Sequence, residues 1–268
     1  MLRQPIAWRW QVSLGLASVL ALVSVYTYLA ARQHGINPDD RTLPTWHQLL
    51  TDGLLKVFKS KHSGTEQAWI WADTKATFNR LVAGLVLGVL FSVIVGLLMG
   101  CYSPIEAFFL PPLSFLAKIP PTAMLAVFFV MAGTGTGMFV TMIAFGVLPT
   151  LAQTIYHAAK EDVPEELLFK AYTLGASQVE CIWDVVYKHT LPKILEGVRL
   201  QVGPAMVYLI AAEMLVGDVG FGYRIKMQGR LLDMSVVYIY LACLGLAGYL
   251  IDRAFILVQR KLCPWYAQ

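Results

Sequence analysis

The chain has 268 residues, of which 57% are hydrophobic and only 14% are charged. Soluble domains usually carry about a quarter charged residues, so this composition predicts a polytopic membrane protein. The formal net charge of +4 is spread along the chain and forms no basic stripe, which excludes a nucleic-acid partner. The cysteines show neither pairing nor metal-ligand spacing, so we expect no metal site; they are Cys101, Cys181, Cys243 and Cys263.

Six apolar segments are long enough to cross a bilayer, which takes about 20 residues. They are residues 12–29, 81–99, 108–131, 138–156, 195–216 and 236–258. A cleaved signal peptide is the alternative for the first segment. Its apolar run is longer than a signal core, however, and Leu29-Ala30-Ala31 is a poor cleavage site. The sequence therefore predicts an all-α fold of about six transmembrane helices.

Six spans place both termini on one side of the lipid bilayer. Positive residues, which favour the cytosolic side, are equally numerous on the two sides of this arrangement. The side of the termini includes Arg3 and Arg9, and the other includes Arg41 and Lys61. Most positive residues on the side opposite the termini lie in the long segment 32–80. Positive residues in long segments influence membrane orientation less, so we expect both termini in the cytosol.

The predicted spans divide the chain into three parts. Residues 1–77 hold the first transmembrane helix and an outer polar segment, 78–260 form a core of about five transmembrane helices, and 261–268 are a cytosolic tail. In the outer segment, apolar residues recur at helical spacing, which indicates a helix lying on the membrane surface or one packed on neighbouring spans. These residues are Leu49, Leu50, Leu54, Leu55 and Phe58.

The second span carries a small residue at every fourth position. Lipid does not drive helices together as water does, so such a groove favours close contact with another helix. A substrate path along this face is the alternative. The groove consists of Gly84, Gly88, Ser92, Gly96 and Gly100.

Two proline pairs interrupt the third span, Pro111-Pro112 and Pro120-Pro121. Prolines free backbone carbonyls, which in lipid must be satisfied inside the protein or by water. We therefore expect a kinked or broken segment that faces the bundle interior. Lys118 lies between the pairs and either reaches the membrane surface or lines a path. Lys118, Pro120 and Pro121 are thus candidate path or gate residues.

The loop between the fourth and fifth spans, residues 158–194, predicts two helices separated by a glycine. Asp162 is suited to cap the first helix, and Gly175 to end it in the left-handed conformation. Ser177, with Glu180 three residues on, predicts a capping box for the second helix, which we expect to end at Leu191-Pro192. The apolar stripe of the second helix is Val179, Ile182, Trp183, Val186 and Tyr187. A shaped helical elbow outside the bilayer is typical of a docking surface.

Three stretches carry a family resemblance. Residues 170–178 read Lys-Ala-Tyr-Thr-Leu-Gly-Ala-Ser-Gln, and 191–200 read Leu-Pro-Lys-Ile-Leu-Glu-Gly-Val-Arg-Leu. Residues 211–223 read Ala-Ala-Glu-Met-Leu-Val-Gly-Asp-Val-Gly-Phe-Gly-Tyr. Together they resemble the EAA loop and following span of ABC importer permeases, in the branch for nitrate, sulfonate, taurine and bicarbonate. The family's Glu-Ala-Ala triplet is replaced here by Phe169-Lys170-Ala171.

The resemblance implies a type I importer permease, a multi-pass inner-membrane protein that works as a homodimer or heterodimer. A separate ATPase chain would hold ATP and Mg, so this chain itself would carry no cofactor and no enzymatic activity. A binding protein outside the cell membrane would deliver the substrate. The elbow would present a coupling helix to the ATPase through Glu165, Glu166, Leu167, Leu168, Phe169, Lys170, Ala171, Tyr172 and Gly175.

Glu213 is a carboxylate in an otherwise apolar span, and such a residue is a functional candidate. A carboxylate repels an anion, so we favour a gate or an ion pair with Arg or Lys over substrate contact. A stand-alone secondary transporter or channel is the alternative function, but it would predict inverted repeats, which the chain does not show. An intramembrane enzyme would need paired catalytic groups within the spans, and we find no catalytic residues.

Overall fold

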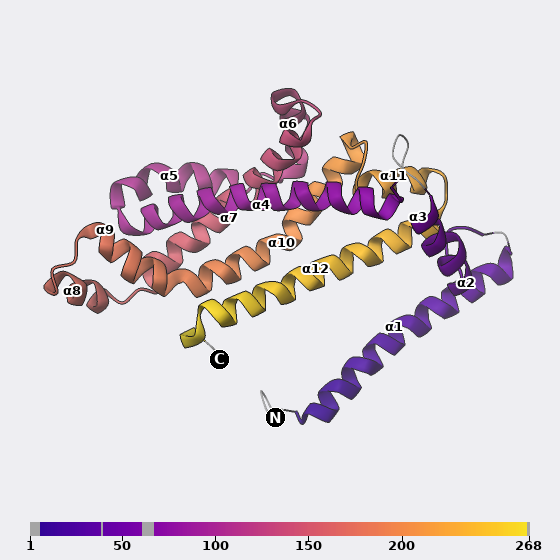
Figure 1. Cartoon of the computed structure of the whole chain (residues 1–268), viewed down its shortest axis with the longest axis horizontal. Helices are drawn as coiled ribbons and strands as arrows, with labels where there is room; N and C mark the ends of the chain where they lie inside the picture. The colour runs from indigo at the N-terminus through magenta and orange to yellow at the C-terminus, as the bar shows by residue number, and fades with distance from the viewer. Residues whose placement is uncertain (1–5, 39, 61–66, 267–268) are drawn as a thin grey trace. The chain divides into compact units, whose positions relative to one another are not determined.

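The computed structural model describes residues 6–38, 40–60 and 67–266 (Figure 1). The chain divides into two compact units, the first made of the residues up to Trp69 together with Met227–Leu241, and the second of Ile70–Lys226 together with the residues from Ala242 onward. Arg3 and Lys61, on which part of the orientation prediction rests, lie outside the described residues. So do the outermost residues of the predicted first and last parts, 1–5 and 267–268, and the three-part division stays a prediction.

The first unit begins with α1 (Trp8–Ile36), which contains the predicted first span. Large apolar side chains are exposed all around α1, and the buried fraction of its apolar stretch is only 6%. A helix that is apolar on every face is suited to lipid rather than to water. Within this unit, the Tyr26 hydroxyl donates to the Pro44 carbonyl at 2.7 Å and its ring meets Trp46 edge-on.

The outer segment forms one continuous helical stretch from α2 (Trp46–Gln48) through a π turn (Leu49–Leu54) to α3 (Leu55–Lys59). Its packed face is centred on Gly53, where a Cβ would lie 2.9 Å from the Ser235 carbonyl oxygen. The predicted apolar stripe lies mainly on another face, because Leu50 and Phe58 are 60% and 50% exposed. This arrangement favours a helix on the membrane surface over one whose apolar stripe is packed on other helices.

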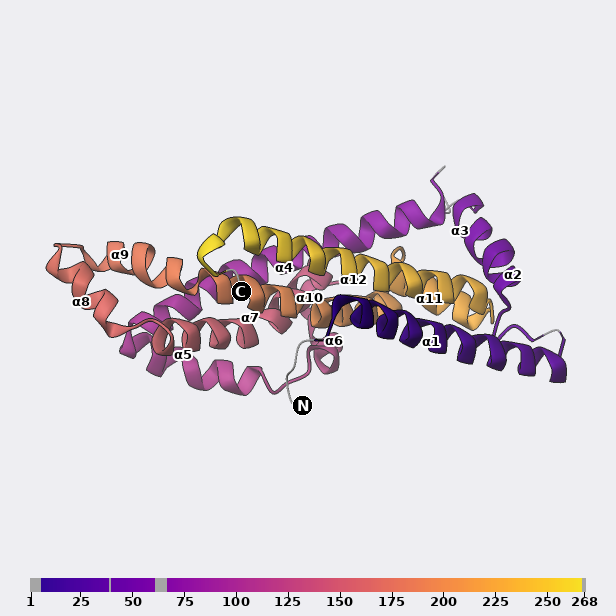
Figure 2. The ribbon, with the colours of Figure 1, turned by 90° about the horizontal axis from the view of Figure 1, so that it is seen from below.

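The second unit is built around α7 (Thr136–Glu161) and α10 (Lys188–Val216), which pack along one another. Beside them run α4 (Trp69–Cys101) and the later part of α12 (Met234–Leu262) (Figures 1 and 2). In the described residues, five helices are long and apolar enough to cross a membrane, or six if a bent helix pair counts as one span. The prediction of an all-α fold with about six transmembrane helices is confirmed.

The small-residue groove of α4 lies against α7. A Cβ on Gly84 would come 2.6 Å from Ile143 Cβ, and a Cβ on Gly100 would come 2.5 Å from Ala159 Cβ. Gly88 and Gly96 meet α7 in the same way, and the Ser92 hydroxyl donates to the Gly88 carbonyl at 2.6 Å. The two backbones approach so closely that no substrate path fits along this face.

The third span is broken, but at only one of its proline pairs. Pro111 and Pro112 lie inside α5 (Ser103–Leu116), which continues past them, so the expectation that they interrupt the helix is wrong. The next residue, Leu113, is buried against α4 and α7, and this packing offsets the lost backbone hydrogen bonds. The break follows at Lys118–Pro120, and a 3₁₀ turn (Pro121–Met124) then leads into α6 (Leu125–Ala132). The two arms are bent by 82°.

The second helix of the elbow does not end at Leu191-Pro192, contrary to the prediction. After α9 (Gln178–Glu180), a π turn (Cys181–Tyr187) leads without interruption into α10, and Pro192 lies buried inside that helix. The Thr190 hydroxyl donates to the Val186 carbonyl at 2.9 Å and to the Tyr187 carbonyl at 3.2 Å, so side-chain hydrogen bonds reinforce the turn before the proline. One missing backbone bond does not break a helix whose faces are packed on both sides.

Candidate functional site

The elbow has the shape that its sequence predicts. Its first helix, α8 (Glu165–Thr173), ends at Gly175, whose φ is +89°. The Ala176 amide donates to the Ala171 carbonyl at 3.1 Å and the Gly175 amide to the Tyr172 carbonyl at 3.0 Å, which is the Schellman pattern of a helix end. Ser177 and Glu180 then form the predicted capping box at the start of α9.

Asp162 has a different role from the one predicted. The residue preceding α8 is Pro164, and no side chain caps this helix. Asp162 instead follows the end of α7 and forms an ion pair with Lys193 of α10. The elbow begins just after Asp162 and ends near Lys193. This ion pair therefore links the two ends of the elbow.

The elbow exposes an unusual amount of apolar surface at one end of the second unit, opposite the start of α11 (Phe221–Arg230) (Figure 2). Of the predicted coupling residues, Phe169 is 64% exposed and Tyr172 49%, while Leu168 packs partly against the core. Glu165, Glu166 and Lys170 are exposed around them. Such apolar side chains with a charged rim are typical of a docking surface.

Three further apolar residues of the elbow were not predicted as part of this surface. Leu174 is 87% exposed, Val179 74% and Trp183 61%. The apolar spacing predicts one stripe that includes Val179, Trp183 and Val186, but of these three only Val186 is buried. The π turn changes the helical phase after Glu180 and so separates the stripe onto different faces. No local signal in the sequence announces this turn.

The elbow is anchored to the helices that carry it. Val163, just before α8, is buried in the core. At the same end, the Lys160 ammonium donates to Glu106 at 2.7 Å and the Tyr156 hydroxyl donates to the same carboxylate at 2.6 Å, which joins α7 to the start of α5. These contacts fix the elbow to both α7 and α5.

Lys118, Pro120 and Pro121 meet in a cleft at the break of the third span. The cleft has a volume of about 140 Å³, and Thr150 and Tyr208 line it from α7 and α10. Lys118 is exposed there. Gly146 makes the close approach possible, because a Cβ at this position would come 2.5 Å from the Tyr208 ring and 2.9 Å from Pro121. The break thus opens a polar, positively charged hollow beside two spans.

Glu213 does not line this cleft. Its carboxylate is completely buried and accepts hydrogen bonds from Thr77 Oγ1 at 2.9 Å, from Arg80 Nη1 at 3.0 Å and from the Gly222 amide at 3.0 Å. The Arg80 guanidinium also lies over the Phe139 ring, 4.2 Å from its centre. Glu213 is therefore the centre of an ion-pair lock between α10 and α4.

The lock also holds the loop after α10. Arg80 Nη1 donates to the Val219 carbonyl at 2.7 Å, and the Thr77 hydroxyl accepts from the Phe221 amide at 2.9 Å. Gly220 has a φ of +124°, and a Cβ there would lie 2.5 Å from the Glu213 carboxyl carbon. A glycine is required at this position because its backbone has a positive φ and because a side chain would collide with the Glu213 carboxylate.

A second buried ion pair lies beside the first. Asp73 accepts from Arg224 Nε at 2.8 Å and from the Gly220 amide at 3.0 Å. The sequence contains a signal for this cluster. Asp73, Thr77 and Arg80 are spaced i, i+4 and i+7 at the head of an apolar helix, and this spacing places them on one face.

A bundle of apolar spans with an anchored helical elbow and a polar hollow at a broken span defines a membrane transport subunit. Residues 84–263 match the family model described as a binding-protein-dependent transport system inner membrane component. The chain belongs to this family of ABC transporter permeases. Membership entails a multi-pass inner-membrane subunit that works with a separate ATPase and a substrate-binding protein, and it rules against a stand-alone transporter or channel.

Individual relatives agree with the family match. The taurine transport system permease protein TauC of Escherichia coli (strain K12) is 28% identical over 265 residues, which cover 97% of this chain and 94% of that one. A protein of Brucella melitensis biotype 1 named a probable ABC transporter permease is 30% identical over 195 residues, 72% of this chain and 78% of that one. An inward-facing structure of the MetNI methionine ABC transporter matches the fold with a TM-score of 0.60 at 19% identity, covering 72% of this chain and 95% of that one. Permeases named for aliphatic sulfonates, nitrate and bicarbonate match at 25 to 28% identity.

Proposed function

We propose that this chain forms the translocation path of an ATP-driven importer for a small solute with a compact anionic group, such as a sulfonate. The relatives named for taurine, aliphatic sulfonates, nitrate and bicarbonate share this chemistry. The hollow beside Lys118 suits it, since the ammonium group of Lys118 attracts an anion. Sulfonates, nitrate and bicarbonate are all within this class.

The observation that carries the proposal is the anchored elbow with its exposed apolar surface. Phe169, Tyr172 and Leu174 are available to fill a pocket on the ATPase, while Glu165 and Lys170 supply rim charges that set the register. ATP and Mg would bind to the ATPase. Closure of the ATPase would move the elbow, and the Asp162–Lys193 ion pair would carry the motion to α7 and α10.

Replacing Phe169 by alanine is expected to lower ATPase association by about tenfold or more, because aromatic anchors often supply about 2 kcal/mol of an interface. The measurement is the amount of ATPase that co-purifies with the tagged permease and its dissociation rate. Phe78→Ala is the matched control, because Phe78 is 53% exposed in the part of α4 beside the start of α11, at the end of the second unit opposite the elbow. Equal ATPase retention by both variants would contradict docking through the elbow.

Lys118→Gln is expected to lower ATP-dependent taurine uptake into proteoliposomes by about tenfold, since the hollow loses its positive charge. A tenfold decrease corresponds to a loss of about 1.4 kcal/mol of attraction for the anion. Lys118→Arg should retain most of the uptake. Lys75→Gln serves as the control, because Lys75 is an exposed lysine of α4 outside the hollow. If Lys118→Gln transports normally for taurine, methanesulfonate, nitrate and bicarbonate, Lys118 does not line the path.

We also infer the orientation of the chain and its dimeric state. The C-terminal end of α12 lies near the elbow, because the Gln259 amide donates to the Pro192 carbonyl at 3.1 Å. Lys193, Arg260 and Lys261 make this end basic, which supports a cytosolic elbow and, with an even number of spans, cytosolic termini. The permease would pair with a second copy or a related chain to enclose the path. Pro120, Pro121 and Glu213 would then support the gate, Glu213 through its lock on α4.

A further inference from the structure

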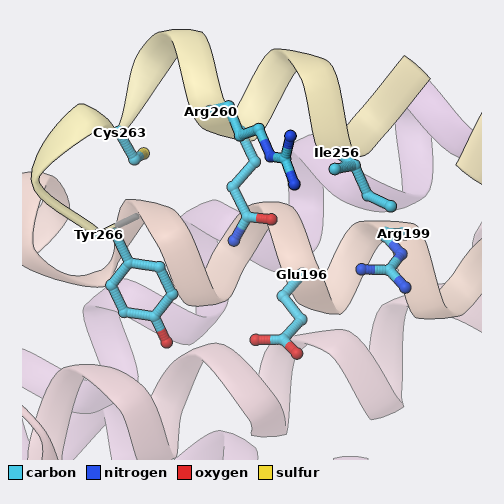
Figure 3. Close-up of a pocket in the computed structure, with 7 residues that line it drawn as sticks. Glu196, Arg199, Ile256, Arg260, Cys263 and Tyr266 are labelled. Carbon is cyan, nitrogen blue, oxygen red and sulfur yellow. The ribbon is translucent and has the colours of Figure 1, made fainter. Parts of the chain in front are cut away.

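A second cleft lies at the elbow end of the second unit, between α10 and the last turns of α12 (Figure 3). Its volume is about 360 Å³, and it is separate from the hollow at Lys118. Residues from one face of the last turns of α12 and from the turn after it line it, spaced i, i+3, i+4 and i+7, opposite two residues of α10. The lining residues are Glu196, Arg199, Ile256, Gln259, Arg260, Cys263 and Tyr266.

The cleft presents N–H donors that no described residue engages. Arg260 makes no hydrogen bond or ion pair with any of the described residues and is exposed. Arg199 donates through Nε to Asp252 at 2.5 Å, and no hydrogen bond from its two Nη atoms to another described residue accompanies this one. Two guanidinium groups therefore offer N–H donors to a ligand, and guanidinium groups are suited to phosphate oxygens.

The remaining lining groups are neutral or accept hydrogen bonds. Glu196 is an exposed carboxylate of α10 with no ion pair among the described residues. Cys263 is fully buried at one side of the cleft, and burial raises the pKa of its thiol, which keeps it neutral at pH 7. A ligand that carries a phosphate and also a hydroxyl group satisfies both Arg260 and Glu196, whereas a bare anion leaves Glu196 opposed to it.

The surroundings of the cleft are apolar. Leu257 and Leu262 of α12 are 59% and 53% exposed, and Trp265 is 63% exposed in the turn that follows. Tryptophan and tyrosine side chains are enriched at the level of lipid headgroups, so Trp265 and Tyr266 indicate that the cleft lies at the membrane surface. A cleft that offers two arginine side chains between two spans at this depth is suited to a lipid headgroup.

We propose that this cleft binds the headgroup of an acidic glycerophospholipid such as phosphatidylglycerol. The phosphate lies between Arg260 and Arg199, a glycerol hydroxyl donates to Glu196, and the acyl chains run along the exposed leucines of α12. The lipid joins α12 to α10 directly beside the elbow. The same phosphate chemistry occurs in free phosphate, so the test must separate the two sources.

The transporter complex is purified with its ATPase, exchanged into phosphatidylglycerol or phosphatidylcholine, and analysed by native mass spectrometry for retained lipid. We expect preferential retention of phosphatidylglycerol and a roughly fivefold loss of retained lipid in Arg260→Gln, as for one basic group at a charged lipid surface. Lys261→Gln is the matched control, because Lys261 is an exposed, adjacent positive residue that does not line the cleft. Glu196→Gln should lower the retention of phosphatidylglycerol. It should leave the retention of phosphatidic acid unchanged, because that lipid has no glycerol headgroup.

Several outcomes would overturn the proposal. Equal losses in Arg260→Gln and Lys261→Gln would show a general surface-charge effect, and equal retention of the two lipids would show no headgroup preference. Displacement of phosphatidylglycerol by millimolar inorganic phosphate would identify a free-anion site instead. Arg260 contacts none of the described residues through a hydrogen bond or ion pair, so the thermal unfolding of Arg260→Gln should match that of wild type. This measurement separates lipid loss from misfolding.

Discussion

Glu213→Ala is expected to destabilise the permease by about 3–5 kcal/mol, because it leaves the buried Arg80 guanidinium without its buried counter-ion. The exposed fractions of the two side chains are 0% for Glu213 and 9% for Arg80, so water does not replace the lost carboxylate. The Thr77 hydroxyl and the Gly222 amide lose the acceptor that they share. The loop after α10 should then detach from α4.

The measurement is thermal unfolding of the detergent-solubilised complex, together with the yield of assembled transporter. Asp218→Asn is the control, because Asp218 also lies near Arg80, at 3.6 Å, but its side chain is 91% exposed. We expect almost no change there. Arg80→Ala should cost a similar amount to Glu213→Ala, and the double variant should cost less than the sum of the two. Additive losses, or a Glu213→Ala complex as stable as wild type, would show that the lock does not hold the fold.

Gly175→Val is expected to uncouple ATP hydrolysis from uptake. No atom of another residue lies within 4 Å of a Cβ built on Gly175, so the substitution creates no clash. Its effect arises from the backbone, because a φ of +89° costs about 1–2 kcal/mol for an L-residue and more for a β-branched one. The Schellman turn should open, and α8 should lose its fixed angle to α9.

Uptake and ATP hydrolysis are measured on the same proteoliposomes. We expect uptake to fall by about tenfold while much of the ATPase activity persists, which corresponds to about 1.4 kcal/mol of lost coupling. Gly175→Asn is the matched control, because asparagine tolerates the left-handed conformation. It should transport nearly as well as wild type. If the valine variant keeps the wild-type ratio of uptake to hydrolysis, the angle of the elbow is not what transmits the motion.

The features of this chain that depend on local chemistry are those that its sequence predicts correctly. A capping serine, a glycine at a helix end and an unbroken apolar run act within a few residues, so the elbow around Gly175 and the spans could be predicted without the fold. Prediction from sequence is wrong where tertiary packing outweighs the helix-breaking tendency of proline. Pro112 and Pro192 lie inside helices, because the buried faces around them offset the backbone hydrogen bonds that proline removes.

The partners of single residues were beyond the reach of the sequence. It marked Glu213 as a charge that needs a counter-ion, but Arg80 is 133 positions away, and only the packing of α4 on α10 brings the two together. In the same way, the groove of α4 was evident from its small residues, while its occupant, α7, was not. The composition and periodicity of this chain determined which segments enter the membrane, since transfer into lipid depends on each segment alone. Which helices touch, and hence where the lock and the two clefts lie, depends on surfaces that exist only once several segments have folded together.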